Sequence, residues 1–431
     1  MGTILITNGR LVDPKNNRDE VTNVLIKNGT IAEIGCAATT VADQVLDATG
    51  LIVAPGLIDL QVHFREPGRE DKETIETGSR AAVKGGVTTA VAMPNSNPKA
   101  DNQSVIEFVI KRAREVGLIN IFPTGAITKG QAGDALAEMR ELKHAGAVAV
   151  TDDGVDVQDA LLLRRAMEYA KTHDLLLMSH CETDTLTAGG VMHEGWVSTQ
   201  LGLPGIPAVS EDLAVEKNLM LAKLTGARLH LLHNSTAGAI DSIRRAKAAG
   251  CDNITAEVSV QHFALTDEMC LGYNTDAKMY PPLRSQEHVV AIIEAIKDGT
   301  IDALTTDHAP HIEPEKLLPF VDAAMGSTGL ETSFAVMYTY LVKPGHISLA
   351  EGLALMTHKP AEIIRVAKGS LEVGADADIA VFDLNAQWVV DPKIMESKGK
   401  NCVFKNLSLT GKAKHVIVGG ELKMKNGVIL Q

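Results

Sequence analysis

The side chains best suited to chemistry in this sequence are histidines and aspartates that follow short apolar segments. His63 follows LIDLQV, Asp153 follows AVAVTD, His180 follows LLLMS, His233 follows RLHLL and Asp307 follows IDALTT. Neutral imidazole and carboxylate are ligands that suit zinc, manganese or iron. No cysteine stands at any of these positions. The set therefore favours a catalytic metal site over a closed structural one.

These residues are far apart in the sequence, so a fold must bring them together. Apolar strand candidates alternate with helical segments, which predicts βαβ units and a parallel sheet. The strand candidates are 57–63, 87–94, 119–127, 147–153, 175–180, 228–233, 254–260 and 301–308. Eight repeats predict an α/β fold with a (β/α)8 TIM-like barrel, in which the carboxyl ends of the strands converge on one mouth. A doubly wound open sheet is the alternative, although no GxGxxG motif follows the first strand.

Other polar residues lie on the same strands. Asp59 is a second potential ligand on the first of them. Because side chains alternate along a strand, the adjacent Asp152 and Asp153 should point to opposite faces, so both are potential ligands but only one of them should face the other ligands. His230 lies an odd number of positions from His233. We therefore expect it to face the surrounding helices.

Both ends of the chain resemble β-hairpins rather than βα units. Asn-Gly pairs at 28–29 and 426–427 are strong signals for tight turns. Chain ends commonly lie close together, so we expect one small β-sandwich-like domain built from 1–54 and 366–431, with the barrel at 55–365. Two separate tails are the alternative. They are less favourable because isolated hairpins are marginal in water.

The composition limits the function classes. Apolar residues make up 45% of the 431 residues and aromatics only 3%, so the core must consist mainly of Ala, Val, Ile and Leu. The formal charge of −13, without a basic stripe, disfavours nucleic acids and anionic membranes as partners. The five cysteines are scattered without a CxxC pair, and no signal peptide or long apolar run is present. We expect a soluble, cytoplasmic protein.

A series of short motifs carries a family resemblance that covers nearly the whole chain. DLQVHFREPG, VAMPNSNP, TDDG, SHCE, LHNS, PPLRS and TDHAPH occur in this order between residues 59 and 311. Together they resemble the signature series of the type I dihydroorotases, which are cyclic amidohydrolases of the amidohydrolase superfamily. GSLEVGADADIAVFD (369–383) is similar to the strand pair that returns such enzymes to their satellite β domain.

The resemblance implies one or two Zn²⁺ ions per chain. His63 and Asp307 would bind one ion, His180 and His233 a second, and Asp153 would bridge the two positions. The residues implied in substrate binding are Arg65, Asn95, Tyr280, His311, Met325 and Gly326. Arg65 and His311 would meet the substrate carboxylate, since a planar guanidinium forms paired hydrogen bonds with a carboxylate.

The sequence departs from the family pattern at Gln61 and Tyr280. Gln61 stands where a His ligand is usual, and an amide oxygen is a poor zinc donor, which weakens the first metal position. Tyr280 stands where relatives typically have an Asn that contacts the substrate. A phenol can donate one hydrogen bond but cannot present the donor and acceptor of an amide together.

The resemblance implies the reversible cyclisation of N-carbamoyl-L-aspartate to (S)-dihydroorotate, with loss of water, in pyrimidine biosynthesis. Metal-activated water would attack the ring amide in the hydrolytic direction, with Asp307 as general base and then acid. We expect a homo-oligomer and a possible complex with aspartate transcarbamoylase.

Three alternatives remain open. One is another cyclic amidohydrolase, of the allantoinase or hydantoinase type, although Arg65 favours an acidic substrate. A second is a catalytically impaired homologue that acts as a scaffold for aspartate transcarbamoylase, for which Gln61 and Tyr280 are the evidence. The third is a metal-binding barrel without enzymatic activity, which no sequence feature favours.

Overall fold

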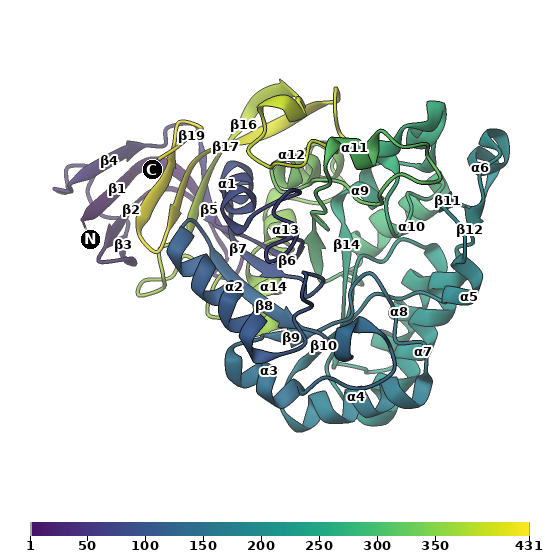
Figure 1. Ribbon diagram of the computed structural model, residues 1–431. Coiled ribbons are helices and arrows are strands. Elements are labelled where there is room, and N and C mark those ends of the chain that lie inside the picture. Colours follow the sequence, from purple (N-terminus) through teal and green to yellow (C-terminus); the bar gives the residue numbers. More distant parts are fainter. Residues whose placement is uncertain (1, 431) are drawn as a thin grey trace.

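The computed structural model describes residues 2–430, and its larger part is a parallel β-barrel (Figure 1). Its eight strands run in the order β15-β14-β13-β10-β9-β8-β7-β6. A parallel bridge between Val62 and His308 joins the first strand to the segment after the last, so the barrel nearly closes. The strands are β6 (Leu57–Val62), β7 (Val87–Ala92), β8 (Asn120–Gly125), β9 (Ala149–Val150), β10 (Leu176–Ser179), β13 (Leu229–Leu231), β14 (Ile254–Ser259) and β15 (Ala303–Thr305). The predicted barrel is confirmed, and the open sheet is wrong.

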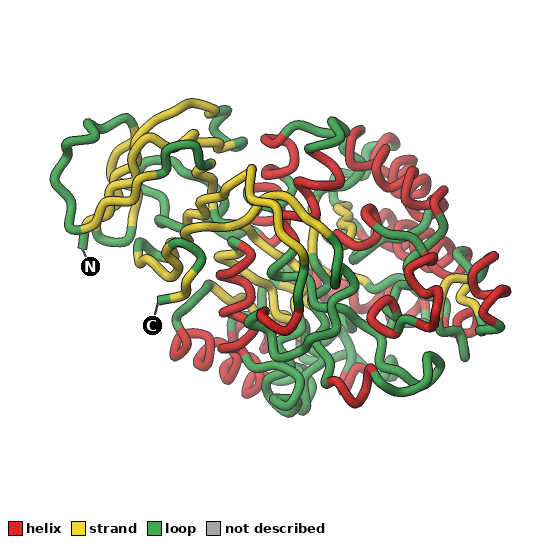
Figure 2. Tube along the Cα trace, turned by 90° about the horizontal axis from the view of Figure 1, so that it is seen from above, coloured by secondary structure: helices red, strands yellow, loops and turns green. Residues whose placement is uncertain are grey.

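Helices cover the outside of the barrel (Figure 2). Short polar side chains fix where several of them begin: Thr74, Asn102, Asp159 and Thr236 each accept a backbone N–H of the first turn. The helices are α1 (Ile75–Gly85), α2 (Gln103–Val116), α3 (Met139–Ala145), α4 (Ala160–Thr172), α5 (Asp184–Thr187), α6 (Trp196–Leu201), α7 (Val209–Thr225), α8 (Ala237–Ala248), α9 (Val260–Ala264), α10 (Gln286–Lys297), α11 (Glu313–Lys316), α12 (Ser333–Met337), α13 (Leu349–Ala354) and α14 (His358–Ile364).

The two ends of the chain form one mixed sheet beside the barrel (purple and yellow in Figure 1). Its strands are β1 (Thr3–Asp13), β2 (Arg18–Lys27), β3 (Thr30–Ile34), β4 (Gln44–Asp47), β5 (Ile52–Pro55), β16 (Ile379–Val389), β17 (Ser408–Val418), β18 (Glu421–Lys425) and β19 (Val428–Ile429). β5 pairs antiparallel with β16, which joins the N-terminal strands directly to the C-terminal ones. The alternative of two separate tails is therefore wrong. A further short pair, β11 (Met192–His193) and β12 (Gly205–Ile206), lies apart from both sheets.

His230 lies inside the barrel, whereas its odd spacing from His233 predicted that it would face the surrounding helices. Leu229 and Leu231 of β13 belong to the apolar cluster shared with the outer helices, whereas His230 lies opposite Met178, an interior residue. His230 is fully buried, and its Nε2 lies 2.9 Å from Glu257 Oε2. Counting back from His233 fails because β13 ends at Leu231 and the chain then changes direction.

Two expectations about composition can be compared with the described residues. All five cysteines are buried and unpaired, as their scatter predicted. Within residues 2–430, no helix has the length and apolar character needed to cross a bilayer.

Candidate metal centre

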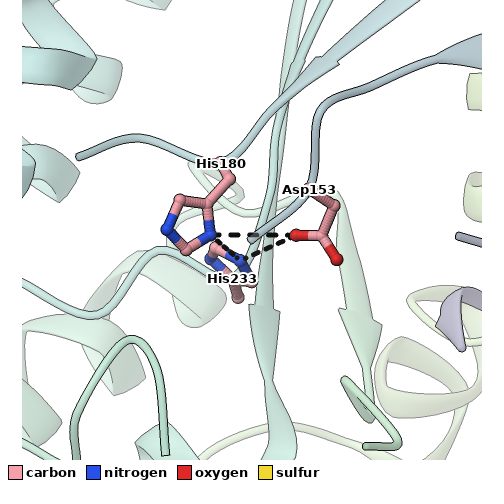
Figure 3. Close-up of side chains that lie close together, drawn as sticks. All are labelled: Asp153, His180 and His233. Atoms are coloured by element: carbon pink, nitrogen blue, oxygen red, sulfur yellow. Dashed lines mark hydrogen bonds and ion pairs between the residues drawn. The ribbon is translucent and has the colours of Figure 1, made fainter. Parts of the chain in front are cut away.

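Asp153, His180 and His233 converge at the mouth of the barrel, although they follow three different strands (Figure 3). His180 Nδ1 lies 2.8 Å from His233 Nε2. Asp153 Oδ1 lies 3.4 Å from His233 Nε2 and 3.7 Å from His180 Nδ1. Two imidazoles and one carboxylate, all buried, are the donor set of a catalytic zinc with an open position.

Another cluster shares Asp153 and consists of His63, Asp153 and Asp307; it is called the first cluster below because it contains the first ligand in the sequence. His63 Nε2 lies 3.2 Å from Asp153 Oδ2 and 3.2 Å from Asp307 Oδ1. Asp153 therefore turns one oxygen toward each cluster. All five residues predicted as ligands come together, while Asp152 turns away and accepts the backbone N–H groups of Ile127 and Thr128.

The backbone at this mouth is unusual. Arg65, His233 and Asp307 have φ values of 60°, 30° and 48°, in the left-handed region that residues with a Cβ rarely adopt. Such conformations cost of order 1–3 kcal/mol each and persist where surrounding contacts enforce them. Two of the three residues, His233 and Asp307, belong to the clusters of potential ligands.

Gln61 lies at the junction of the two clusters. Its Nε2 donates to Asp153 Oδ1 over 3.0 Å, the same oxygen that faces His180 and His233. Its Oε1 is buried and has no hydrogen-bond partner among the described residues. The Gln61 amide thus donates a hydrogen bond to the shared carboxylate through Nε2. Its oxygen is left buried without a hydrogen-bond donor.

The carboxylates and imidazoles of the two clusters shift one another's pKa. Burial opposes ionisation of Asp153, but the imidazoles of His233 and His63 hold its pKa well below the usual range. Burial also works against protonation of His63, but Asp153 and Asp307 raise its pKa to about 9. Because a metal ion needs neutral imidazoles and ionised carboxylates, metal binding at these clusters should depend on pH.

Arg65 is half-buried and lacks an ion pair among residues 2–430. Its Nε donates to the Pro310 carbonyl over 3.3 Å. Burial lowers its pKa to about 10, partly offset by the field of Asp307 and Asp153, so it stays charged at neutral pH. A half-buried guanidinium that has no carboxylate partner can form paired hydrogen bonds with the carboxylate of a substrate.

Asn95 lies beside the first cluster. Its Oδ1 lies 2.8 Å from His63 Nδ1, which directs His63 Nε2 toward the two carboxylates. Such a contact fixes the tautomer and orientation of a potential ligand. Asn95 was predicted to contact the substrate, and in this arrangement it also orients His63.

His311 is engaged by protein groups on both ring nitrogens. Nε2 lies 2.8 Å from the Met325 carbonyl, and Nδ1 lies 2.9 Å from Lys72 Nζ. Gly326 packs on the ring, because a Cβ at this glycine would lie 3.1 Å from Nε2. Burial, Arg65 and Lys72 lower the pKa of His311 to about 3, so the ring is neutral. Contact with a substrate carboxylate would require Nε2–H to exchange the Met325 carbonyl for it.

Tyr280 stacks on His180. The ring centroids are 5.2 Å apart and the planes differ by 28°. The phenol that stands in place of the family's Asn therefore covers one face of a potential metal ligand. Its effect on substrate binding stays a prediction.

Sequence reasoning missed one residue that supports the site, Glu182, and gave another, Asp59, the wrong role. Glu182 Oε2 lies 3.2 Å from His180 Nε2 and so orients that ring; its position in the SHCE motif was the available signal. Asp59 was counted among the potential ligands but belongs to neither cluster. It accepts Thr306 Oγ1 over 2.6 Å, because its strand position turns it toward the neighbouring strand exit.

Imidazoles and carboxylates gathered at the mouth of a closed parallel barrel define a metal-dependent amidohydrolase, and residues 233–422 match the amidohydrolase family. Residues 50–239 match the dihydro-orotase-like family. The chain belongs to the dihydroorotase family.

Full-length relatives carry this assignment. The chain is 48% identical over 426 residues to a dihydroorotase of Pelotomaculum thermopropionicum, covering 99% of both chains. It is 46% identical over 427 residues to a dihydroorotase of Ruminiclostridium cellulolyticum, covering 99% of this chain and 100% of the relative. Among solved structures, an L-hydantoinase (dihydropyrimidinase) from Arthrobacter aurescens aligns with a TM-score of 0.89 at 26% identity, covering 100% of this chain and 98% of that one.

Proposed function

We propose that the chain is a dihydroorotase that interconverts N-carbamoyl-L-aspartate and (S)-dihydroorotate by closing and opening a cyclic amide. The observation that carries the substrate choice is Arg65, a half-buried guanidinium near the two clusters whose printed hydrogen bond goes to a backbone carbonyl and not to a carboxylate. Dihydroorotate carries a carboxylate that can pair with it, whereas hydantoin and allantoin lack one. The full-length dihydroorotase relatives support the same choice over a hydantoinase.

The donor set fits a metal ion, and we propose zinc. Asp153, His180 and His233 would hold one ion, and His63, Asp153 and Asp307 a second. When bound, the metal supplies Lewis acidity that polarises an amide carbonyl and makes hydroxide available near neutral pH. Gln61 is the weak point of the first position, the one with His63 and Asp307, because its amide is a neutral oxygen donor.

Asp307 is proposed to move the proton. Its Oδ1 lies 3.2 Å from His63 Nε2, and the side chain is buried beside the metal position. In hydrolysis it takes a proton from the attacking water and delivers it to the departing ring nitrogen; in synthesis the order reverses. Arg65 holds the carboxylate, with Asn95, Tyr280, His311, Met325 and Gly326 around the ring.

Assembly and location also remain proposals. We infer a homo-oligomer, association with an aspartate transcarbamoylase and a cytoplasmic location. The boundaries 1–54, 55–365 and 366–431 are likewise proposed as the limits of the satellite domain and the barrel.

The deciding experiment is an assay of the purified chain with dihydroorotate, hydantoin and allantoin, run beside elemental analysis. We expect turnover of dihydroorotate alone, together with bound zinc. Preference for hydantoin or allantoin would refute the substrate assignment. Absence of any turnover in the metal-loaded chain, but full activity of a transcarbamoylase in its presence, would favour the scaffold function that Gln61 and Tyr280 suggested.

A further inference from the structure

A buried ion pair lies directly behind His233. Glu211, in the first turn of α7, and Arg284, in the PPLRS motif, approach to 3.3 Å between Oε2 and Nη2. Their side chains are only 4% and 2% exposed. Neither residue belongs to the metal clusters or to the substrate set.

The pair forms hydrogen bonds with the segment that follows His233. Glu211 Oε1 accepts the Ser235 N–H over 2.7 Å and the Thr236 N–H over 3.1 Å. The Ser235 hydroxyl donates to Glu211 Oε2 and accepts Arg284 Nε over 3.0 Å. These bonds hold the two residues that connect His233, through Asn234, to α8.

Arg284 also contacts the segment that follows His180. Its Nη1 donates to the Ile206 carbonyl over 3.0 Å and lies 3.3 Å from His193 Nδ1. Burial and the charge of Arg284 lower the pKa of His193 to about 3, so this imidazole accepts from Arg284 and carries no charge. One guanidinium therefore ties together the excursions that follow β10 and β13.

The backbone conformation of His233 explains why these hydrogen bonds are needed. With φ at 30°, His233 has a conformation that a residue with a Cβ adopts only under constraint. A buried ion pair adds little net stability, because desolvation offsets the attraction. The pair instead fixes the backbone geometry, because the amides that it binds, those of Ser235 and Thr236, come two and three residues after His233.

We propose that Glu211 and Arg284 are a positioning pair that keeps His233 in its left-handed conformation, aims its imidazole at Asp153 and His180, and so sets the affinity of that cluster for a divalent metal. The inference rests on the metal site of the proposed function and adds two residues to it.

The test is the affinity of the metal-free protein for Zn²⁺, measured by competition with a chromophoric chelator. Glu211→Gln keeps the acceptor oxygen but removes the charge, and Arg284→Lys keeps the charge but removes the fork. Loss of a residue that orients a ligand typically weakens metal binding about 10–100-fold, and we expect this range for both variants. The visible spectrum of the Co²⁺-loaded variants should also shift, because its bands report the coordination geometry.

Asp378→Asn is the matched control. Asp378 is 5% exposed, accepts the Gly419 N–H over 2.7 Å and pairs with Lys368 over 2.8 Å. It also accepts Asn120 Nδ2, at the start of β8 and thus at the opposite end of the barrel from the mouth. This variant should lower the melting temperature without changing Zn²⁺ affinity or the Co²⁺ spectrum.

The outcomes separate the two proposals. Wild type that binds neither Zn²⁺ nor Co²⁺ would refute the metal site itself. A second outcome is that wild type binds metal and both variants fold, bind Zn²⁺ within twofold of the wild-type affinity and give the wild-type Co²⁺ spectrum. This outcome would show that Glu211 and Arg284 only stabilise the fold. If Glu211→Gln does not fold, Arg284→Lys and Ser235→Ala decide, since the latter removes the hydroxyl that bridges the pair and leaves both charges.

Discussion

Replacing Gln61 with His should turn a one-ion site into a two-ion site. In wild type, the Gln61 amide donates to Asp153 over 3.0 Å, and its buried Oε1 has no partner. The first cluster therefore has His63, Asp307 and a share of Asp153. An imidazole at position 61 would add a strong donor beside them.

The size of the effect follows from the number of ligands. Zinc sites with four protein ligands bind with apparent free energies of about 10–16 kcal/mol, or about 3 kcal/mol per ligand. Since 1.4 kcal/mol corresponds to a factor of ten, the missing imidazole weakens the first position about 100-fold. Without metal, Gln61→His also loses a hydrogen bond to an ionised carboxylate, which costs about 1.5–3 kcal/mol of unfolding free energy.

Elemental analysis after dialysis against chelators of graded affinity measures this effect. Wild type should retain about one ion per chain, and Gln61→His about two, if each protein ligand contributes about equally to zinc affinity. Gln131→His is the control, because Gln131 contacts the backbone carbonyl of Asp153 over 3.5 Å rather than its carboxylate. Two ions held tightly by wild type would show that Gln61 completes the first position adequately, and the reasoning from its donor strength would be wrong.

Three further changes test other parts of the site and fold. Arg65→Ala should abolish turnover of dihydroorotate with unchanged metal content, because Arg65 belongs to neither cluster; loss of metal would contradict its assignment. Asp307→Asn should lower kcat by about 10²–10⁴-fold, the contribution of a positioned proton carrier, and near wild-type kcat would exclude it from proton transfer. Burial raises the pKa of Glu331 from 4.5 to about 7, so the unfolded chain ionises first and stability falls as pH rises between these values. Glu331→Gln should therefore gain up to about 3 kcal/mol over wild type at pH 8 and little at pH 4, by urea unfolding; an equal difference at both would refute the assigned pKa.

The barrel could be predicted because its signal repeats. Each of the eight predicted strands contains one observed barrel strand, although β9 and β15 are shorter than their apolar segments. Apolar periodicity reports burial, whereas strand ends depend on where the ladder of hydrogen bonds stops. The antiparallel pairing of β5 with β16 was foreseeable only as proximity of the chain ends, since nothing local specifies its register.

The ligand set could be predicted because residue type and strand position agreed. His63, Asp153, His180, His233 and Asp307 all come together. The contacts that orient them could not be read from residue type and strand position alone. Glu182 and Asn95 reach imidazoles over 3.2 and 2.8 Å, and such distances depend on loop paths with no repeating pattern.

The buried carboxylates show where reasoning from residue type stops. Asp59, Asp153 and Glu211 are all nearly inaccessible to solvent, and by type each could bind a metal. Only Asp153 faces imidazoles; Asp59 accepts Thr306 beside Asp307, and Glu211 accepts the amides that follow His233. Asp59 thus binds the residue before Asp307, and Glu211 binds the second and third residues after His233; both Asp307 and His233 have positive φ. Because such conformations need enforcing contacts, a buried acid that binds backbone amides at a strand exit is as much part of the site as a ligand. Strand parity cannot distinguish the two, because the chain leaves its strand direction at those residues.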